Sequence, residues 1–412
     1  MSMLAIHPEE SCARVAAIAG AEHTRLQGET VIAAPATVQE ISAILRFAHD
    51  NGLAVVPTGA GTKLAWGNPV TPRIVLSLHR MAALREHSWQ DMTCTVEAGC
   101  PWNTLEAALA RHGQVVALDP LWPQRATVGG IAAANDSGAL RLKYGSLRDL
   151  ILGMTLVLPD GAIAKTGGKV VKNVAGYDLH KLMIGSFGTL AVIAEVNFRL
   201  HPIETNTRTW TAIAPQPNAL EAPLRALFDS QIVPTSVQVR SRKQACSVDV
   251  RIAARPGCLE EFGPRLQSLF GDLELSESSS VVWDARQQLF DRSGAAILKI
   301  SVLPGEIASM LARLQEWASF GGIELATVAQ ATGLITAAVT MAPEAALALI
   351  EPLREQVRAF GGSVVALQIP AEFRSRFDVW GCDSSALDLM REVKRRFDPH
   401  RILNPGRFVG EI

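Results

Sequence analysis

The sequence predicts an α+β protein of two domains, and three observations carry this prediction. The chain has 412 residues, enough for two or three hydrophobic cores. Its first half alternates short apolar strand signals with amphipathic helix signals. Its second half repeats one plan three times: a strand, a proline, a helix that ends in Phe-Gly, and another strand. Such a repeat favours one mainly antiparallel sheet with helices packed on one face.

The regular elements of the first half begin at Thr30. Residues 30–35 have a strand pattern, and Thr37-Val-Gln-Glu40 is a capping-box pattern that opens a helix ending at Asn51-Gly52. Further strands at 53–56, 73–78 and 92–97, a helix at 103–112 and a strand at 114–118 follow in order. Two long glycine-punctuated stretches come next. Each ends in an apolar strand, the first before a Pro-Asp-Gly turn at 159–161 and the second before His201-Pro202.

In the second half, the three repeats are marked by Pro256, Pro304 and Pro343. The uncharged segment 325–342 contains Gly333 and four threonines, which indicates two buried strands around a turn, not a membrane span. A helix near 385–396 precedes an irregular tail with two prolines. We therefore divide the chain into a first domain (1–203), a second domain (204–396) and a tail (397–412) that returns to the first domain.

Composition and charge exclude several function classes. The formal net charge is −1 and no Lys/Arg run exceeds Lys394–Arg396, so a nucleic-acid-binding surface is not expected. The six cysteines are scattered and form no CxxC pair, which argues against an iron–sulfur cluster, a zinc site or a disulfide framework. This cysteine usage predicts a reducing, cytoplasmic compartment. Glu9 and Glu10 precede the first apolar run, unlike the basic start of a signal peptide.

The segment PTGAGTKLAWGNP, residues 57–69, is the first candidate site. A glycine-rich loop after a strand brings backbone N–H groups close to an anion. In a nucleotide P-loop the lysine follows glycine, whereas Lys63 follows Thr62. The Rossmann fingerprint needs a glycine where Leu64 stands. Neither pattern fits, and the spacing alone leaves open a simple turn whose glycines adopt positive φ.

Four ordered stretches together resemble one family, the FAD-binding oxidases of the vanillyl-alcohol-oxidase type, whose FAD domain is of the PCMH type. They are VVPTGAGTKLAWG, TVGGIAAANDSGALRLKYGSLRDLILGMTLVLPDG, GGKVVKNVAGYDLHKLMIGSFGTLAVIAEVNFRL and the tail ILNPGRF. Within that family the pattern is similar to the FAD-binding E subunits of bacterial glycolate oxidases. The third stretch is the most diagnostic, because Phe187 stands where stand-alone 2-hydroxy-acid dehydrogenases usually carry a glutamate.

This resemblance implies a two-part PCMH-type FAD-binding domain followed by a sheet domain of the FAD-linked oxidase C-terminal type. It implies FAD held noncovalently, because the loop 57–69 contains no histidine. The amides of residues 59–62 are expected to wrap the pyrophosphate, with Lys63 either adding charge or remaining solvated. The cofactor contacts that the resemblance implies are Gly59, Ala60, Gly61, Thr62, Lys63, Gly67, Asn68, Pro120, Thr127, Gly129, Gly130, Asn135, Gly138, Gly145 and Ile193.

The resemblance assigns no catalytic residue. Relatives that oxidise 2-hydroxy acids carry a histidine-rich motif in the C-terminal domain, whereas the corresponding stretch FGGSVVALQIPAEFRSRF has no histidine, so no metal site is expected. His180 is expected to be a polar surface or packing residue. Arg374 and Arg376 either hold a carboxylate or form a solvated pair.

The implied activity is participation in the oxidation of glycolate or another 2-hydroxy acid. The implied partners are a sister flavin subunit and an iron–sulfur subunit that passes electrons to a quinone. The implied location is the cytoplasm, with membrane contact only through these partners. Two alternatives stay open: a self-sufficient FAD-dependent dehydrogenase of the D-lactate type, and an FAD-fold scaffold that has lost its cofactor.

Overall fold

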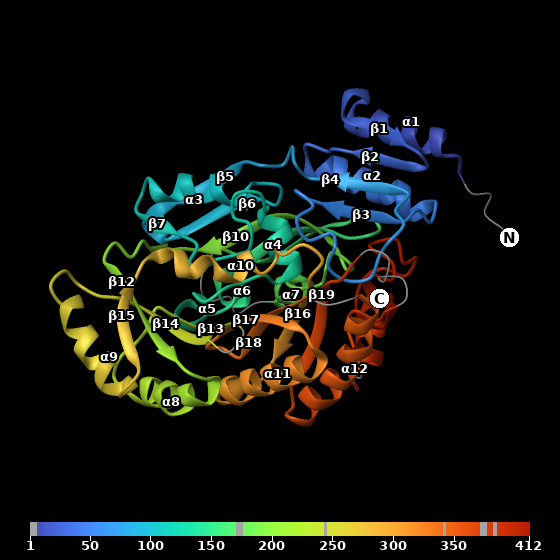
Figure 1. Ribbon diagram of the computed structural model, residues 1–412. Coiled ribbons are helices and arrows are strands. Elements are labelled where there is room, and N and C mark those ends of the chain that lie inside the picture. The colour runs from blue at the N-terminus through green and yellow to red at the C-terminus, as the bar shows by residue number, and fades with distance from the viewer. Residues whose placement is uncertain (1–5, 170–175, 243–244, 341–342, 371–376, 382–384) are drawn as a thin grey trace. The chain divides into compact units, whose positions relative to one another are not determined.

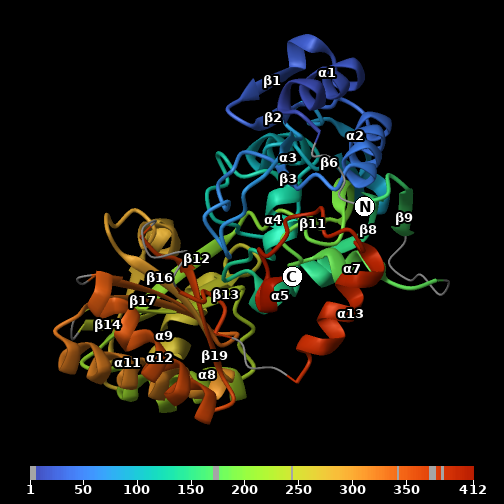
Figure 2. The same cartoon turned by 90° about the vertical axis from the view of Figure 1, so that its right-hand side faces the viewer.

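The computed structural model describes residues 6–169, 176–242, 245–340, 343–370, 377–381 and 385–412 (Figures 1 and 2). The chain forms two compact units. Unit 1 comprises residues 1–137, 146–203 and 382–412, and unit 2 comprises residues 138–145 and 204–381. Arg374 and Arg376, expected either to hold a carboxylate or to form a solvated pair, lie outside the described residues, as do residues 170–175 of the diagnostic stretch.

The first part of unit 1 is a four-stranded sheet in the order β1-β2-β4-β3. Its strands are β1 (Thr24–Gln27), β2 (Thr30–Ala33), β4 (Ile74–Ser77) and β3 (Val55–Thr58), of which β1 alone is antiparallel to its neighbour. The helix α2 (Val38–Asp50) connects β2 to β3. The Thr37 hydroxyl accepts the Glu40 amide at 3.1 Å, and the Glu40 carboxylate accepts the Ala36 amide at 2.8 Å, so the predicted helix cap is confirmed.

The second part of unit 1 is an antiparallel five-stranded sheet in the order β5-β6-β10-β8-β9. Its strands are β5 (Leu84–Ser88), β6 (Thr93–Glu97), β10 (Val192–Arg199), β8 (Ile151–Val157) and β9 (Ile163–Gly167). The short pair β7 (Gln114–Val115) and β11 (His201–Pro202) is separate. The helices of unit 1, besides α2, are α1 (Pro8–Ala19), α3 (Trp102–Ala110), α4 (Val128–Ala134), α6 (Leu147–Leu150), α7 (Leu179–Met183) and α13 (Leu387–Phe397).

Unit 2 is built on one eight-stranded antiparallel sheet in the order β15-β12-β14-β13-β17-β18-β16-β19. The strands are β12 (Thr207–Ala214), β13 (Ser236–Arg242), β14 (Ala245–Ala253), β15 (Glu274–Ser278), β16 (Ala296–Ser301), β17 (Glu324–Gln330), β18 (Leu334–Thr340) and β19 (Ser363–Gln368). The helices are α5 (Arg141–Tyr144), α8 (Glu221–Asp229), α9 (Phe262–Phe270), α10 (Ala285–Gln288), α11 (Ile307–Gly321) and α12 (Pro343–Ala359). The predicted antiparallel sheet, with β17 and β18 paired around the turn at Gly333, is confirmed.

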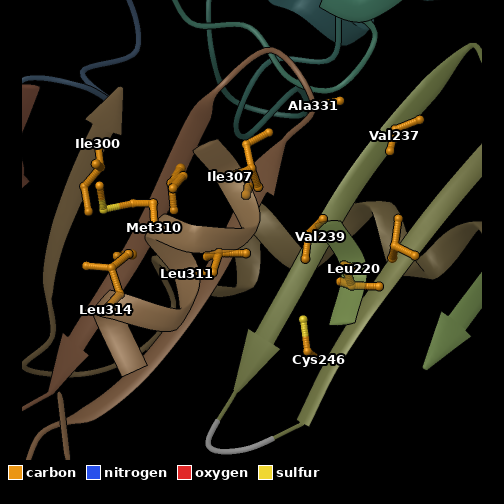
Figure 3. Packing of buried hydrophobic residues seen from close by; sticks show 14 of the residues in the cluster. Leu220, Val237, Val239, Cys246, Ile300, Ile307, Met310, Leu311, Leu314 and Ala331 are labelled. Atoms are coloured by element: carbon orange, nitrogen blue, oxygen red, sulfur yellow. The ribbon is translucent and has the colours of Figure 1, made fainter. Parts of the chain in front are cut away.

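The repeat in unit 2 has four copies, one more than the sequence indicated. In each copy two strands joined by a helix flank a third strand: β12-α8-β13, β14-α9-β15, β16-α11-β17 and β18-α12-β19. Two such copies form a four-stranded, ferredoxin-like half of the sheet. The two halves are joined where β13 pairs with β17. The helices cover one face, where Met310, Leu311 and Leu314 of α11 pack against strand residues such as Ile300 (Figure 3).

The two units differ from the predicted domains at two places. Residues 138–145 group with unit 2, and residues 382–396 group with unit 1. The second difference has a clear cause in Lys394 of α13, which is buried and donates to the Thr189 carbonyl at 2.7 Å and to the Asp398 carboxylate at 2.6 Å. Among the described residues, no helix combines the length and apolar character needed to cross a membrane.

Candidate functional site

The glycine-rich loop 57–64 lines a cleft in unit 1. The space inside the cleft, including the open solvent at its mouth, is about 710 Å³. Its other walls come from α4, from Ala98 after β6, from β10 and from the turn at Phe187-Gly188. The residues lining it are largely small or apolar: Pro57, Thr58, Gly59, Ala60, Gly61, Thr62, Lys63, Leu64, Leu78, Ala98, Thr127, Gly129, Gly130, Ala133, Ala134, Phe187, Gly188, Ala191, Ile193 and Arg407.

Four successive backbone amides distinguish this loop. Within the described part of the chain, the N–H groups of Gly59, Ala60, Gly61 and Thr62 donate to no protein acceptor. Gly61 adopts a φ of +73°, which bends the loop as side-chain-bearing residues rarely do. Consecutive N–H groups on such a bend form a nest for an anion, and the Thr62 hydroxyl adds one more donor.

The two glycines of α4 serve different purposes. A Cβ on Gly129 would stand 2.7 Å from the Ala98 Cβ, and the Gly129 amide donates to the Ala98 carbonyl at 2.7 Å. Gly129 is therefore needed for close packing of α4 against the chain after β6. A Cβ on Gly130 would meet only the Thr127 Oγ1, at 3.2 Å, so Gly130 leaves free space on the cleft side of the helix.

Lys63 is buried, with 7% of its surface exposed, and its Nζ lies 3.1 Å from the Asp136 carboxylate. The same ammonium lies 5.7 Å and 5.3 Å from the ring centroids of Trp66 and Trp122. The Asp136 carboxylate also accepts the Leu121 amide at 2.8 Å. The expectation of a solvated lysine is therefore wrong, because the ion pair and two aromatic rings enclose the ammonium.

Arg407, near the end of the chain, completes the cleft, and sequence reasoning did not single it out. Its guanidinium donates to the carbonyls of Leu64 at 3.0 Å, Lys63 at 3.3 Å and Trp66 at 3.4 Å. Only 6% of its surface is exposed, and this burial lowers the pKa of Arg407 to about 10. The tail motif ILNPGRF was the available signal, but it did not reveal which residue reaches the loop.

Two family models match parts of this chain. The model of the FAD binding domain matches residues 30–167, and that of the FAD linked oxidases, C-terminal domain, matches residues 382–408. The glycolate oxidase subunit GlcD of Bacillus subtilis is 26% identical over 92% of this chain and 89% of its own length. The chain carries an FAD binding domain and the C-terminal domain of FAD linked oxidases, and it is similar to this glycolate oxidase subunit. FAD is accordingly its cofactor, and it is an FAD-linked oxidoreductase with a PCMH-type FAD-binding domain.

Two further proteins are similar to the chain in sequence, and one solved structure shares its fold. The D-lactate dehydrogenase of Archaeoglobus fulgidus is 28% identical over 93% of this chain and 92% of its own length. A D-2-hydroxyglutarate dehydrogenase of Xanthomonas citri is 35% identical over 41% of this chain and 36% of its own length. The 4-ethylphenol oxidase of Gulosibacter chungangensis has the same fold, with a TM-score of 0.75 and 13% identity over 97% of this chain and 96% of that one.

The cleft fits one part of FAD in particular. A diphosphate needs several N–H donors in a row, and the loop offers them at residues 59–62. The part of FAD next to the diphosphate needs space that no side chain fills. Gly130, Ala133 and Ala134 provide a cleft wall of small residues there. Nine of the fifteen residues that the sequence assigned to the cofactor line the cleft: Gly59, Ala60, Gly61, Thr62, Lys63, Thr127, Gly129, Gly130 and Ile193.

The remaining six lie elsewhere. Asn68 fastens the loop to the tail, since its amide and side chain donate to the carbonyls of Arg407 and Gly406, both at 3.0 Å, and Gly67 precedes it with a φ of +79°. Asn135 ends α4 in the left-handed conformation, with a φ of 49°. Pro120 is buried in unit 1, while Gly138 and Gly145 belong to unit 2.

His180 of α7 is a buried packing residue. Only 3% of its surface is exposed, and its Nδ1 lies 3.4 Å from the Thr166 hydroxyl. Desolvation lowers the pKa of His180, and the nearby Asp178 carboxylate opposes that shift. Of the two expectations for this residue, packing is confirmed and a surface position is wrong.

Proposed function

We propose that this chain is the FAD-binding subunit of a glycolate-oxidase-type complex and takes part in the oxidation of 2-hydroxy acids to 2-oxo acids. Three similar proteins support the substrate class, since their names give glycolate, D-lactate and D-2-hydroxyglutarate, which share a hydroxyl on the carbon next to a carboxylate. One observation supports the proposed position of FAD: the backbone amides of residues 59–62 and Gly130 line the same cleft.

FAD and the residues that line the cleft have different proposed roles. When bound, FAD would supply a redox group that can accept electrons released in the oxidation. The loop amides hold its diphosphate, Gly130 leaves room for the cofactor next to α4, and the apolar side chain of Ile193 on β10 helps to exclude water. The loop has no histidine, so we propose noncovalent attachment. We also propose that FAD contacts Gly67, Asn68, Pro120, Asn135, Gly138 and Gly145, as the resemblance implies.

Removal of the substrate's hydroxyl proton needs a base, and histidine is the usual choice. The nine histidines of this chain all lie before residue 202 or at His400, so unit 2 contains none. This distribution supports a division in which a sister flavin subunit oxidises the substrate and an iron–sulfur subunit carries electrons to a quinone. Any membrane contact of the cytoplasmic complex would then come from the partners.

The alternative is a self-sufficient FAD-dependent dehydrogenase, and the names of the lactate and hydroxyglutarate enzymes favour it. Anaerobic mixing of the flavin-loaded isolated chain with glycolate or D-lactate separates the two proposals. We expect no bleaching of the flavin absorbance by the isolated chain, and bleaching after co-purification with its partner subunits. Bleaching of the isolated chain within one turnover would overturn the subunit proposal in favour of the dehydrogenase.

The same preparation tests the cofactor's position. Hydrogen exchange of the amides at residues 59–62 is expected to slow on addition of FAD, since bound phosphate oxygens replace water as their acceptors. If FAD binds while these amides exchange as before, the proposed cleft is not the cofactor site.

A further inference from the structure

The last residues of the chain form a strap that we define as residues 398–408. The strap runs along the edge strand β3, where the Val55 amide donates to the Ile402 carbonyl at 2.7 Å and the Asn404 amide donates to the Val55 carbonyl at 3.0 Å. Lys394 fixes its start, since Nζ donates to the Leu403 carbonyl at 2.9 Å as well as to the Asp398 carboxylate at 2.6 Å. The strap is thus joined to the edge of this sheet by an isolated bridge between Val55 and Leu403.

Arg407 attaches the strap to the glycine-rich loop. Its guanidinium occupies the carbonyl oxygens of Lys63, Leu64 and Trp66, directly after the four amides that lack a protein acceptor in the described chain. A guanidinium spreads five N–H donors over three nitrogens in a fixed plane, whereas an ammonium presents its three donors from a single atom. Arg407 therefore fixes the carbonyl side of the same loop whose N–H side borders the cleft.

Asn404 attaches the strap to the opposite wall of the cleft. Its Nδ2 donates to the Phe187 carbonyl at 2.9 Å and to the Gly188 carbonyl at 3.2 Å. Phe187 has a φ of 54°, so this turn is held in a conformation that is costly for a residue with a side chain. The Asn404 Oδ1 in turn accepts from Arg407 at 3.2 Å, which joins the two attachments.

We infer that Arg407 and Asn404 are positioning residues for the flavin, and that the strap holds the two cofactor loops at their binding separation. This inference rests on the proposed placement of FAD in the cleft of unit 1. Cofactor binding and docking of the strap are then linked, because each is favourable only when both loops are in place. Bound FAD should protect the strap, and a loosened strap should release FAD.

The matched pair Arg407→Lys and Arg401→Lys tests this linkage. Both changes keep the charge and both lie on the strap, but Arg401 is exposed and donates to the Glu411 carbonyl, away from the cleft. We expect Arg407→Lys to raise the dissociation constant of FAD by about tenfold or more, as the loss of hydrogen bonds to a charged group implies. Arg401→Lys should leave it unchanged.

A third variant, Asn404→Asp, isolates the other attachment. It keeps the Oδ1 that Arg407 uses and removes the donor to Phe187 and Gly188, so it too should weaken FAD binding. Aspartate also tolerates the left-handed backbone of this position, with a φ of 43°, so the change acts through the side chain, whose second carboxylate oxygen would face the Phe187 and Gly188 carbonyls.

Hydrogen exchange distinguishes positioning from general destabilisation. In Arg407→Lys we expect faster exchange at residues 59–66, with the core strands β2 and β4 unchanged. In the unaltered protein, FAD should slow exchange at residues 402–408. If Arg407→Lys retains FAD with an unchanged dissociation constant while FAD still protects residues 59–62, the inference fails and the proposed site stands. If FAD protects neither the loop nor the strap in the unaltered protein, the proposed site itself fails.

Discussion

Gly59 lies so close to Thr127 that a Cβ on Gly59 would stand 1.9 Å from the Thr127 Oγ1. The same hydroxyl caps α4 by accepting the Gly130 amide at 3.4 Å. The glycine-rich loop and the first turn of α4 are therefore packed against each other through one missing side chain. This contact sets the distance between the N–H groups of the loop and the small-residue wall of the cleft.

The first prediction concerns this contact. Gly59→Ala should lower the free energy of unfolding by about 1–3 kcal/mol, because overpacking displaces either the loop or the helix. Thr127→Ala alone should cost about 1 kcal/mol through loss of the helix cap. Thr127→Ala removes the hydroxyl with which the methyl group added by Gly59→Ala would clash. The double variant should therefore lose less stability than the two single variants lose together. Chemical denaturation of all four proteins checks this, and strict additivity would show that the two residues do not interact.

The second prediction separates Gly129 from Gly130. Gly129→Ala should lower the free energy of unfolding of the cofactor-free chain by about 1–3 kcal/mol, because its Cβ would strike the Ala98 Cβ. Gly130→Ala should leave that free energy unchanged or raise it by up to about 1 kcal/mol, since alanine favours a helix. Its methyl group would nevertheless enter the cleft and weaken FAD binding.

Flavin absorbance after gel filtration, together with denaturation of the cofactor-free protein, checks both halves of this prediction. Gly130→Arg and Gly61→Arg extend it, since a long side chain in the cleft should abolish flavin retention. Full flavin absorbance in either arginine variant would contradict the proposed position of the cofactor.

The third prediction addresses Lys63. Lys63→Met leaves the buried Asp136 carboxylate without its ammonium partner 3.1 Å away, and should cost about 3–5 kcal/mol of stability. The double variant Lys63→Met with Asp136→Asn removes both charges and should recover most of this loss. Thermal and chemical denaturation of the cofactor-free proteins are the measurements. A Lys63→Met protein of normal stability that loses FAD would instead show that Lys63 mainly binds the phosphates.

Local patterns in the sequence predicted the elements whose stability is local. The cap formed by Thr37 and Glu40 predicted α2, and the uncharged segment around Gly333 predicted the β17-β18 hairpin. The fourth repeat, β12-α8-β13, was missed because its helix ends at Asp229 without the Phe-Gly signal of the other copies.

Long-range contacts explain what the sequence did not predict. The helix α4 contains two glycines among seven residues, which local propensity disfavours, and it depends on the Thr127 cap and on contacts with the Ala98 and Cys100 carbonyls. Arg407 reaches a loop more than three hundred residues earlier in the chain, so its partners follow only from the three-dimensional fold. Motif resemblance identified the loop and the tail separately, but not the hydrogen bonds between them.

The final prediction is a pH dependence of stability that comes from His180. Desolvation lowers the pKa of this imidazole below its usual 6.5, against the opposing charge of Asp178. As the pH falls below about 6.5, His180 becomes protonated in the unfolded chain before it does so in the folded chain. His180 therefore contributes stability above about pH 6.5, and this contribution is lost as the pH falls toward the folded-state pKa. The loss approaches at most ~1.4 kcal/mol per pH unit for one proton.

His180→Gln should reduce this acid-side slope, whereas His79→Gln, which changes an exposed histidine, should retain it. Denaturation curves of the cofactor-free proteins between about pH 7.5 and pH 5.5 give the slopes, and the comparison does not depend on their absolute stabilities. Equal slopes for His180→Gln and the unaltered protein would mean that the pKa of His180 is the same in the folded and the unfolded chain. That result would contradict the desolvation expected of a ring that is 3% exposed and lies 3.4 Å from the Thr166 hydroxyl of β9.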